Sequence, residues 1–156
     1  VYNKNKNNPS NNSFLKKKEV QKQFILPKET PKIQYRFALS ILRKTDYKKA
    51  ELAFTEFIQR NPKNKLAPNA RYWLGESFYV RKNYRSAAEA FLRGYQQAPA
   101  GLKAPDSLLK LGMSLANLKK NQDACATFNK LAKDYPDASD NIKKYLIREL
   151  KRSNCK

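Results

Sequence analysis

The stretch from Asn69 to Phe91 reads NARYWLGESFYVRKNYRSAAEAF, and it decides the fold. It contains the only tryptophan of the chain, a Leu-Gly pair, and an alanine four residues before a phenylalanine. The alanine and the phenylalanine recur 37 residues away on both sides. The stretch is therefore one copy of a repeated unit.

Four ladders of residues share this spacing, two of them made of proline, one of alanine and one of phenylalanine. Their members are Pro31, Pro68 and Pro105; Ala50, Ala87 and Ala124; Phe54, Phe91 and Phe128; and Pro62, Pro99 and Pro136. Fixed periods of about 20 to 50 residues are typical of stacked supersecondary units. The ladders predict repeats over about 31–67, 68–104 and 105–138.

Each unit has the pattern of two helices. Its first proline stands where a helix can start without an N–H partner, and its last proline stops the second helix. In unit three, Leu108, Leu111 and Leu115 recur at helical steps. A small residue lies at the middle of every first helix, where it would let two helices cross closely. These residues are Ala38, Gly75 and Gly112.

This pattern predicts an all-α fold, a solenoid of the tetratricopeptide-repeat (TPR) type with three helix pairs and a C-terminal capping helix. The helices are expected near 32–44, 47–60, 68–81, 84–97, 105–119, 121–133 and 139–152. The last of them would cover the end of the core with Ile142, Tyr145, Leu146 and Leu150. Residues 1–30 are Lys- and Asn-rich and fit no unit, so we expect a disordered linker there, with a short interaction helix as the alternative.

The chain of 156 residues has a formal net charge of +20, which attracts anionic partners. Along the sequence the charge is diffuse: residues 1–30 carry seven Lys against two Glu, and residues 31–136 carry 20 Lys and Arg against eight acids. This distribution does not predict specific nucleic-acid binding. No apolar run is long enough to span a bilayer. The chain begins at Val1 without an apolar signal core, so we expect a processed product or a fragment.

The sequence contains no catalytic constellation. It has no histidine for general base chemistry and no glycine-rich phosphate loop, and Glu76 and Asp106 are isolated acids. Two cysteines without histidine supply too few soft ligands for a metal. We therefore expect no enzyme activity, no cofactor and no metal.

A stack of helix pairs binds extended or helical segments in the groove lined by its first helices. Helical phase places one set of side chains in this groove, with Trp73 as the leading candidate for a binding hot spot. Packing of Trp73 against the neighbouring unit is the alternative. The predicted groove residues are Tyr35, Arg36, Leu39, Arg43, Asn69, Tyr72, Trp73, Glu76, Tyr79, Leu109, Lys110 and Met113.

Beyond a generic repeat, the elements YWLGE (72–76), LLKLG (108–112), ACATF (124–128) and YP (135–136) resemble the periplasmic cell-division coordinator family CpoB/YbgF of the Tol–Pal system. The resemblance covers about residues 32–155. It implies a periplasmic, non-enzymatic adaptor that binds TolA and coordinates peptidoglycan synthesis by a penicillin-binding synthase with outer-membrane constriction. The family usually forms trimers through an N-terminal coiled coil, and this chain has no such segment, so we expect a homo-oligomer only if a coiled coil precedes it.

The resemblance also bears on the two cysteines, because similar proteins end in a cysteine after an Ala-Cys pair in the last repeat. An isolated pair in an oxidising periplasm usually joins, so we expect a Cys125–Cys155 disulfide. Length counting along two antiparallel helices leaves Cys155 about 10 Å beyond Cys125, a gap that the tail would have to close by folding back.

Two other functions remain open from the sequence. One is a basic solenoid that binds a polyanion, suggested by the net charge. The other is a different TPR assembly factor of the cell envelope, such as an outer-membrane lipoprotein.

Overall fold

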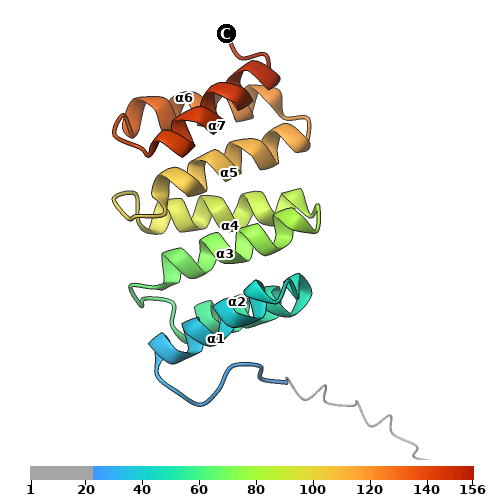
Figure 1. The fold of residues 1–156 in the computed structure, drawn as a ribbon, viewed down its shortest axis with the longest axis vertical. Helices are drawn as coiled ribbons and strands as arrows, with labels where there is room; N and C mark the ends of the chain where they lie inside the picture. Colours follow the sequence, from blue (N-terminus) through green and yellow to red (C-terminus); the bar gives the residue numbers. More distant parts are fainter. Residues whose placement is uncertain (1–22) are drawn as a thin grey trace, which may run out of the picture.

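The structure, a computed structural model, describes residues 23–156. This part of the chain forms seven helices and no strand: α1 (Pro31–Arg43), α2 (Tyr47–Arg60), α3 (Ala67–Val80), α4 (Tyr84–Gln97), α5 (Ala104–Asn117), α6 (Asn121–Asp134) and α7 (Asp140–Arg152). The helices stack one after another along the long axis of the molecule (Figure 1). Within the described residues, no helix combines the length and apolarity that crossing a membrane requires.

The helix boundaries follow from capping chemistry, and the predicted boundaries agree with them to within two residues. Pro31, Pro68 and Pro105 lie in the first turns of α1, α3 and α5, where a missing N–H costs no hydrogen bond. Asp46 caps α2 by accepting a hydrogen bond from the Lys49 amide at 3.1 Å. Asn83 caps α4 in the same way, so side-chain oxygens satisfy amides that the helices leave free.

Close helix crossings hold each pair together, as the small mid-helix residues predicted. A Cβ built on Gly75 would lie 2.6 Å from the ring of Phe91, and one built on Gly112 would lie 2.3 Å from the ring of Phe128. Both rings are fully buried, so neither can move aside into solvent. The repeated phenylalanine therefore packs directly on the backbone of the first helix of its own unit.

The core consists of two clusters of buried side chains that meet in α3. The first centres on Phe54 and Phe57, and the second on Phe91 and Phe128. All three ladder phenylalanines and all three ladder alanines are completely buried, which confirms that the 37-residue ladders mark the core. Trp73 packs against both clusters, so the core is continuous from one unit to the next.

The segment before α1 differs from the predicted linker. Leu26 is buried against α2, and the carboxylate of Glu56 accepts hydrogen bonds from the amides of Ile25 at 2.8 Å and Leu26 at 3.2 Å. The boundary at residue 30 was therefore placed too late, because this backbone covers the open end of the first core cluster. Residues 1–22 lie outside the described part, and their assignment as a linker remains a prediction.

At the other end, α7 covers the last unit as expected from its apolar face. Ile142 and Leu146 are buried, and Leu150 packs beside them. Tyr145, predicted to share this face, is instead 45% exposed. Glu149 is buried and accepts hydrogen bonds from the guanidinium of the neighbouring Arg148.

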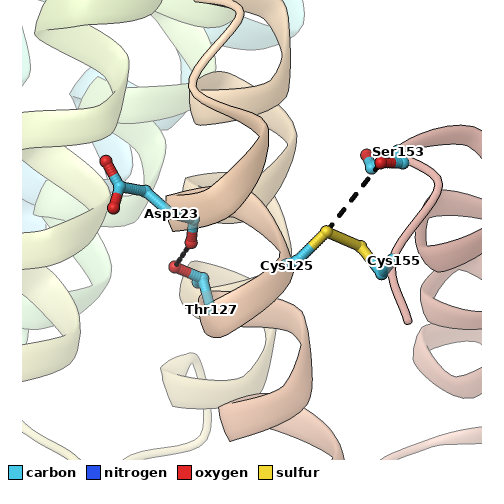
Figure 2. Close-up of a disulfide and its surroundings, with 5 residues drawn as sticks. All are labelled: Asp123, Cys125, Thr127, Ser153 and Cys155. Atoms are coloured by element: carbon cyan, nitrogen blue, oxygen red, sulfur yellow. Dashed lines mark hydrogen bonds between the residues drawn. A yellow bond between two sulfur atoms is a disulfide. The ribbon is translucent and has the colours of Figure 1, made fainter.

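A disulfide joins Cys125 in α6 to Cys155 just beyond α7, with the two Cα atoms 5.4 Å apart (Figure 2). Counting residues along the two antiparallel helices leaves Cys155 beyond Cys125. A turn after α7 closes this distance. Asn154 adopts a left-handed conformation with a φ of 53°, and the Cys155 amide donates to the carbonyl of Leu150. The tail thus folds back onto α6.

The Gly–Phe crossing predicts that a larger residue at position 112 destabilises the fold. We expect Gly112→Val to lower the free energy of unfolding by about 3 kcal/mol, because the buried Phe128 ring must shift or its helix must move outward. Urea unfolding followed by circular dichroism measures the change.

The matched control is Ala126→Val on α6, which also adds a β-branched side chain to a helix but at an exposed position. At this position we expect the free energy of unfolding to fall by only about 0.5 kcal/mol, the difference in helix propensity between alanine and valine. Equal effects of the two substitutions would contradict the tight crossing.

Because of the disulfide, we expect the stability of the fold to depend on the oxidation state of Cys125 and Cys155. The disulfide spans 30 residues, and a cross-link of this span contributes about 3.5 kcal/mol in the chain-entropy description. We expect a reductant to lower the urea midpoint of the oxidised protein to that of the double variant Cys125→Ser/Cys155→Ser. The double variant itself should not respond to the reductant, and an unchanged midpoint of the reduced protein would refute the contribution.

Candidate functional site

The first helices of the units, α1, α3 and α5, together with α7, form the surface on which the sequence places the groove. We call it the first-helix surface. It is continuous, because a hydrogen bond between Trp73 and Tyr35 joins α3 to α1, α3 contacts α5, and α5 contacts α7.

Trp73 lies at the junction of units one and two. Its indole N–H donates a 2.9 Å hydrogen bond to the hydroxyl of Tyr35, and the side chain of Asn69 also hydrogen-bonds this hydroxyl. The Tyr35 ring in turn packs edge-on against Phe57, with 5.8 Å between the ring centres. Trp73 is half-buried. Both interpretations of this residue therefore describe part of what it does: it joins two units and still presents part of its ring to solvent.

Two of the predicted groove residues do not line a groove. Tyr72 is 7% exposed and packs against Phe91, and Leu109 is 5% exposed in the same core cluster. They occupy the same place in their units as Tyr35, which is half-buried. This position is more buried in units two and three than in unit one, because units two and three each have neighbours on both sides.

A second junction, between units two and three, is polar. The ammonium of Lys110 lies 2.9 Å from the carboxylate of Glu76 and 4.9 Å from the ring centre of Tyr79. Asn117 donates a hydrogen bond to the Tyr79 hydroxyl at 3.2 Å. Three of the predicted residues are thus brought together, with α3 and α5 each supplying partners.

Lys103 was not predicted and belongs to this surface. Its ammonium lies 4.7 Å from the ring centre of Tyr72 and 5.0 Å from that of Trp73, within reach of cation–π attraction. It comes from the loop before α5, where unit two has Leu66, so the repeat gave no signal for it. Asn117 was also missed, although a signal exists: it follows Tyr79 by 38 residues, as Trp73 follows Tyr35.

The remaining predicted residues differ in exposure. Arg36 and Arg43 on α1 are exposed, whereas Leu39 and Met113 are half-buried. The part of the first-helix surface that a partner can reach therefore has a partly apolar centre and two free cations at its α1 end.

Burial sets the charge state of the tyrosines on this surface. Desolvation raises the pKa of Tyr72, and the carboxylates of Glu76 and Asp106 raise it further. Burial likewise raises the pKa of Tyr35 and that of Tyr79, against the lowering effect of their hydrogen-bond donors. All three hydroxyls are therefore neutral at physiological pH, and those of Tyr35 and Tyr79 accept hydrogen bonds from the neighbouring unit.

Comparison with known families agrees with this geometry. Two family models described as tetratricopeptide repeat match the chain, one over residues 35–101 and one over residues 106–138. The chain is an all-α TPR solenoid. TPR domains are protein-interaction scaffolds. Among residues 23–156, no three His, Cys, Asp or Glu side chains lie close enough together to hold a metal ion.

Comparison with individual proteins is more limited. The TPR domain is 40% identical over 45 residues to the cell division coordinator CpoB of Pseudomonas putida strain KT2440, a match that covers 29% of this chain and 17% of that protein. Among solved structures it is similar to the second TPR domain of human RPAP3, determined in complex with the HSP70 peptide SGPTIEEVD, with a TM-score of 0.67. That match covers 81% of this chain and all of the RPAP3 domain at 14% identity, so it supports the fold alone.

The Trp73–Tyr35 contact predicts a graded loss of stability. Trp73→Phe keeps most of the packing but removes the hydrogen bond between units, so we expect a loss of about 1 kcal/mol. Trp73→Ala also removes the ring that packs on both core clusters, and we expect about 3 kcal/mol. Urea unfolding measures both, and a Trp73→Ala variant as stable as the parent protein would show that the ring does not couple the units.

Proposed function

We propose that this TPR domain acts as a non-enzymatic adaptor in the periplasm. In this role it binds TolA and, with a penicillin-binding peptidoglycan synthase as a further partner, coordinates peptidoglycan synthesis with outer-membrane constriction during division. The observation that carries the proposal is the 40% identity over 45 residues to a cell division coordinator. The sequence elements in the central and last repeats support the same family.

The first-helix surface supports the binding part of this proposal. Trp73, Tyr79 and Met113 are partly exposed on adjacent helices and offer apolar contact area. Aromatic side chains that are held rigidly, as Trp73 and Tyr79 are by their hydrogen bonds, are enriched among residues that dominate binding energies. A partner segment lying across α3 and α5 would contact all three.

The disulfide supports the proposed location in the periplasm. Structural disulfides persist in oxidising environments such as the bacterial periplasm and are rare in the cytosol. The Cys125–Cys155 bond closes the end of the solenoid, where it helps to hold the capping helix in place.

A polyanion-binding solenoid remains the second candidate function, favoured by the net charge of +20. The two candidates differ in their response to salt. Binding by neutralisation of phosphates weakens steeply as salt rises, whereas binding through buried apolar contacts does not.

The test is an isothermal titration of the oxidised chain with the periplasmic part of TolA at low and high salt. We expect binding that persists at high salt and weakens about tenfold in Met113→Gln, a substitution of similar size that removes an apolar contact from the first-helix surface. Met113 is preferred to Trp73 as the test position, because Trp73 also makes the hydrogen bond between units one and two. Met113 packs beside the core, so circular dichroism must verify that the variant is folded.

The matched control is Leu92→Gln on α4, which removes an apolar side chain that is 38% exposed on a second helix. We expect its affinity for TolA to stay within about twofold of the parent value. Absence of TolA binding at either salt concentration would refute the adaptor proposal. Equal weakening by the two variants would refute the assignment of the binding surface.

A further inference from the structure

The positive charge, diffuse along the sequence, is uneven in the folded molecule. Because the helices alternate in direction, the three turns within units lie along one edge of the solenoid, and the C-terminal end of α7 points to the same edge (Figure 1, right). The loops between units lie along the opposite edge. The disulfide agrees with this arrangement, since it holds the end of the chain against the early part of α6.

The two edges differ sharply in charge. Segments 43–49, 80–85, 117–123 and 151–156 form the first edge, and they contain twelve Lys and Arg against two Asp. We call these four segments the basic rim. Segments 30–32, 60–66, 97–106 and 134–140 form the opposite edge, and they contain five Lys and Arg against four Asp.

The cations of the basic rim are available to a partner. All twelve are exposed, and among the described residues only Arg81 takes part in an ion pair, with Glu51. On the opposite edge, by contrast, Arg60 pairs with Glu56, and Lys103 lies near Asp106. The rim therefore presents charge that the protein itself does not neutralise.

The backbone of the turns does not explain why lysine is used there. Thr45, Lys82 and Lys119 occupy equivalent places in the three turns, and each has a φ near +60°. Glycine adopts this conformation most easily, and asparagine is the usual substitute. Lysine nevertheless stands at two of these three places, and both lysines are exposed.

We propose that the basic rim binds a surface of anionic lipid headgroups, with the solenoid standing on its edge. A row of separate protruding turns suits a flat charged surface, which every tip can touch at once. Clustered lysines and arginines near an anionic membrane each contribute to such binding without inserting into it. The exposed apolar side chain of Val80 lies among these cations and fits the headgroup region as well.

The same features disfavour a single-stranded nucleic acid as the partner. Proteins that bind single strands offer exposed aromatic rings on which bases stack. The aromatic residues in the turns, Tyr47 and Tyr84, are half-buried, and the Tyr84 ring packs edge-on against Tyr79 at 5.3 Å. The rim thus provides charge without a stacking platform.

Docking by the rim does not depend on the proposed adaptor function. The first-helix surface lies on the side of the solenoid, so a molecule standing on its edge keeps that surface open. Loss of TolA binding would leave this inference intact, and loss of lipid binding would leave the adaptor proposal intact.

The test measures partitioning of the full chain onto phosphatidylcholine vesicles with and without phosphatidylglycerol, by cosedimentation. The rim variant is Lys44→Gln/Lys82→Gln/Lys119→Gln. The matched control is Lys32→Gln/Lys63→Gln/Lys65→Gln, which removes the same charge from exposed positions on the opposite edge. Circular dichroism verifies that both variants are folded.

We expect the parent chain to bind only the vesicles that contain phosphatidylglycerol. The rim variant should lose about a hundredfold in partitioning, about fivefold for each charge, and the control should lose less than about threefold. Equal losses in the two variants, or no binding of the parent chain to anionic vesicles, would overturn the proposal. Tighter rim-dependent binding to an oligonucleotide at equal phosphate concentration would overturn it as well.

Discussion

The packing of a phenylalanine ring on the backbone of a crossing helix is the contact on which the rest of the structure depends. It sets the distance between the two helices of a unit, because the ring of Phe91 or Phe128 leaves no room for a side chain at Gly75 or Gly112. In unit one, Ala38 and Phe54 hold the equivalent places, and both are completely buried in the same core cluster. Once each pair has this spacing, the alanines of the second helices are buried and the next pair can stack on the first.

Apolar stacking alone does not fix how one unit is aligned against the next. Polar contacts between the units provide this alignment. Trp73 reaches back to Tyr35, and Asn117 reaches back to Tyr79 across the same separation of 38 residues. These contacts lie on the first-helix surface, so the residues that align the units are also those that a partner would meet. Binding and stability are therefore linked on this surface, and variants there must be interpreted with both effects in mind.

The repeat predicted the fold well because it depends on a few residues whose roles are local. A proline in a first turn, a glycine at a crossing and a buried phenylalanine act through their immediate surroundings, and each recurs at a fixed spacing. The site was harder to predict. Helical phase placed Tyr72 and Leu109 in the groove, but burial by neighbouring units removes them from it. Lys103 comes from a loop that lacks a repeated pattern, and its position over Tyr72 depends on the path of that loop.

The same limit applies to charge. A count along the chain cannot reveal an asymmetry that arises only when alternate turns are brought to one edge, as they are in the basic rim. The disulfide also determines how far the domain can be extended by a pulling force. A pulling force applied between the two ends would straighten the earlier repeats, but the 30 residues closed by Cys125 and Cys155 cannot lengthen. The fully extended oxidised chain is thus shorter by about 10 nm than the reduced one, so oxidation limits how far the domain can stretch under load.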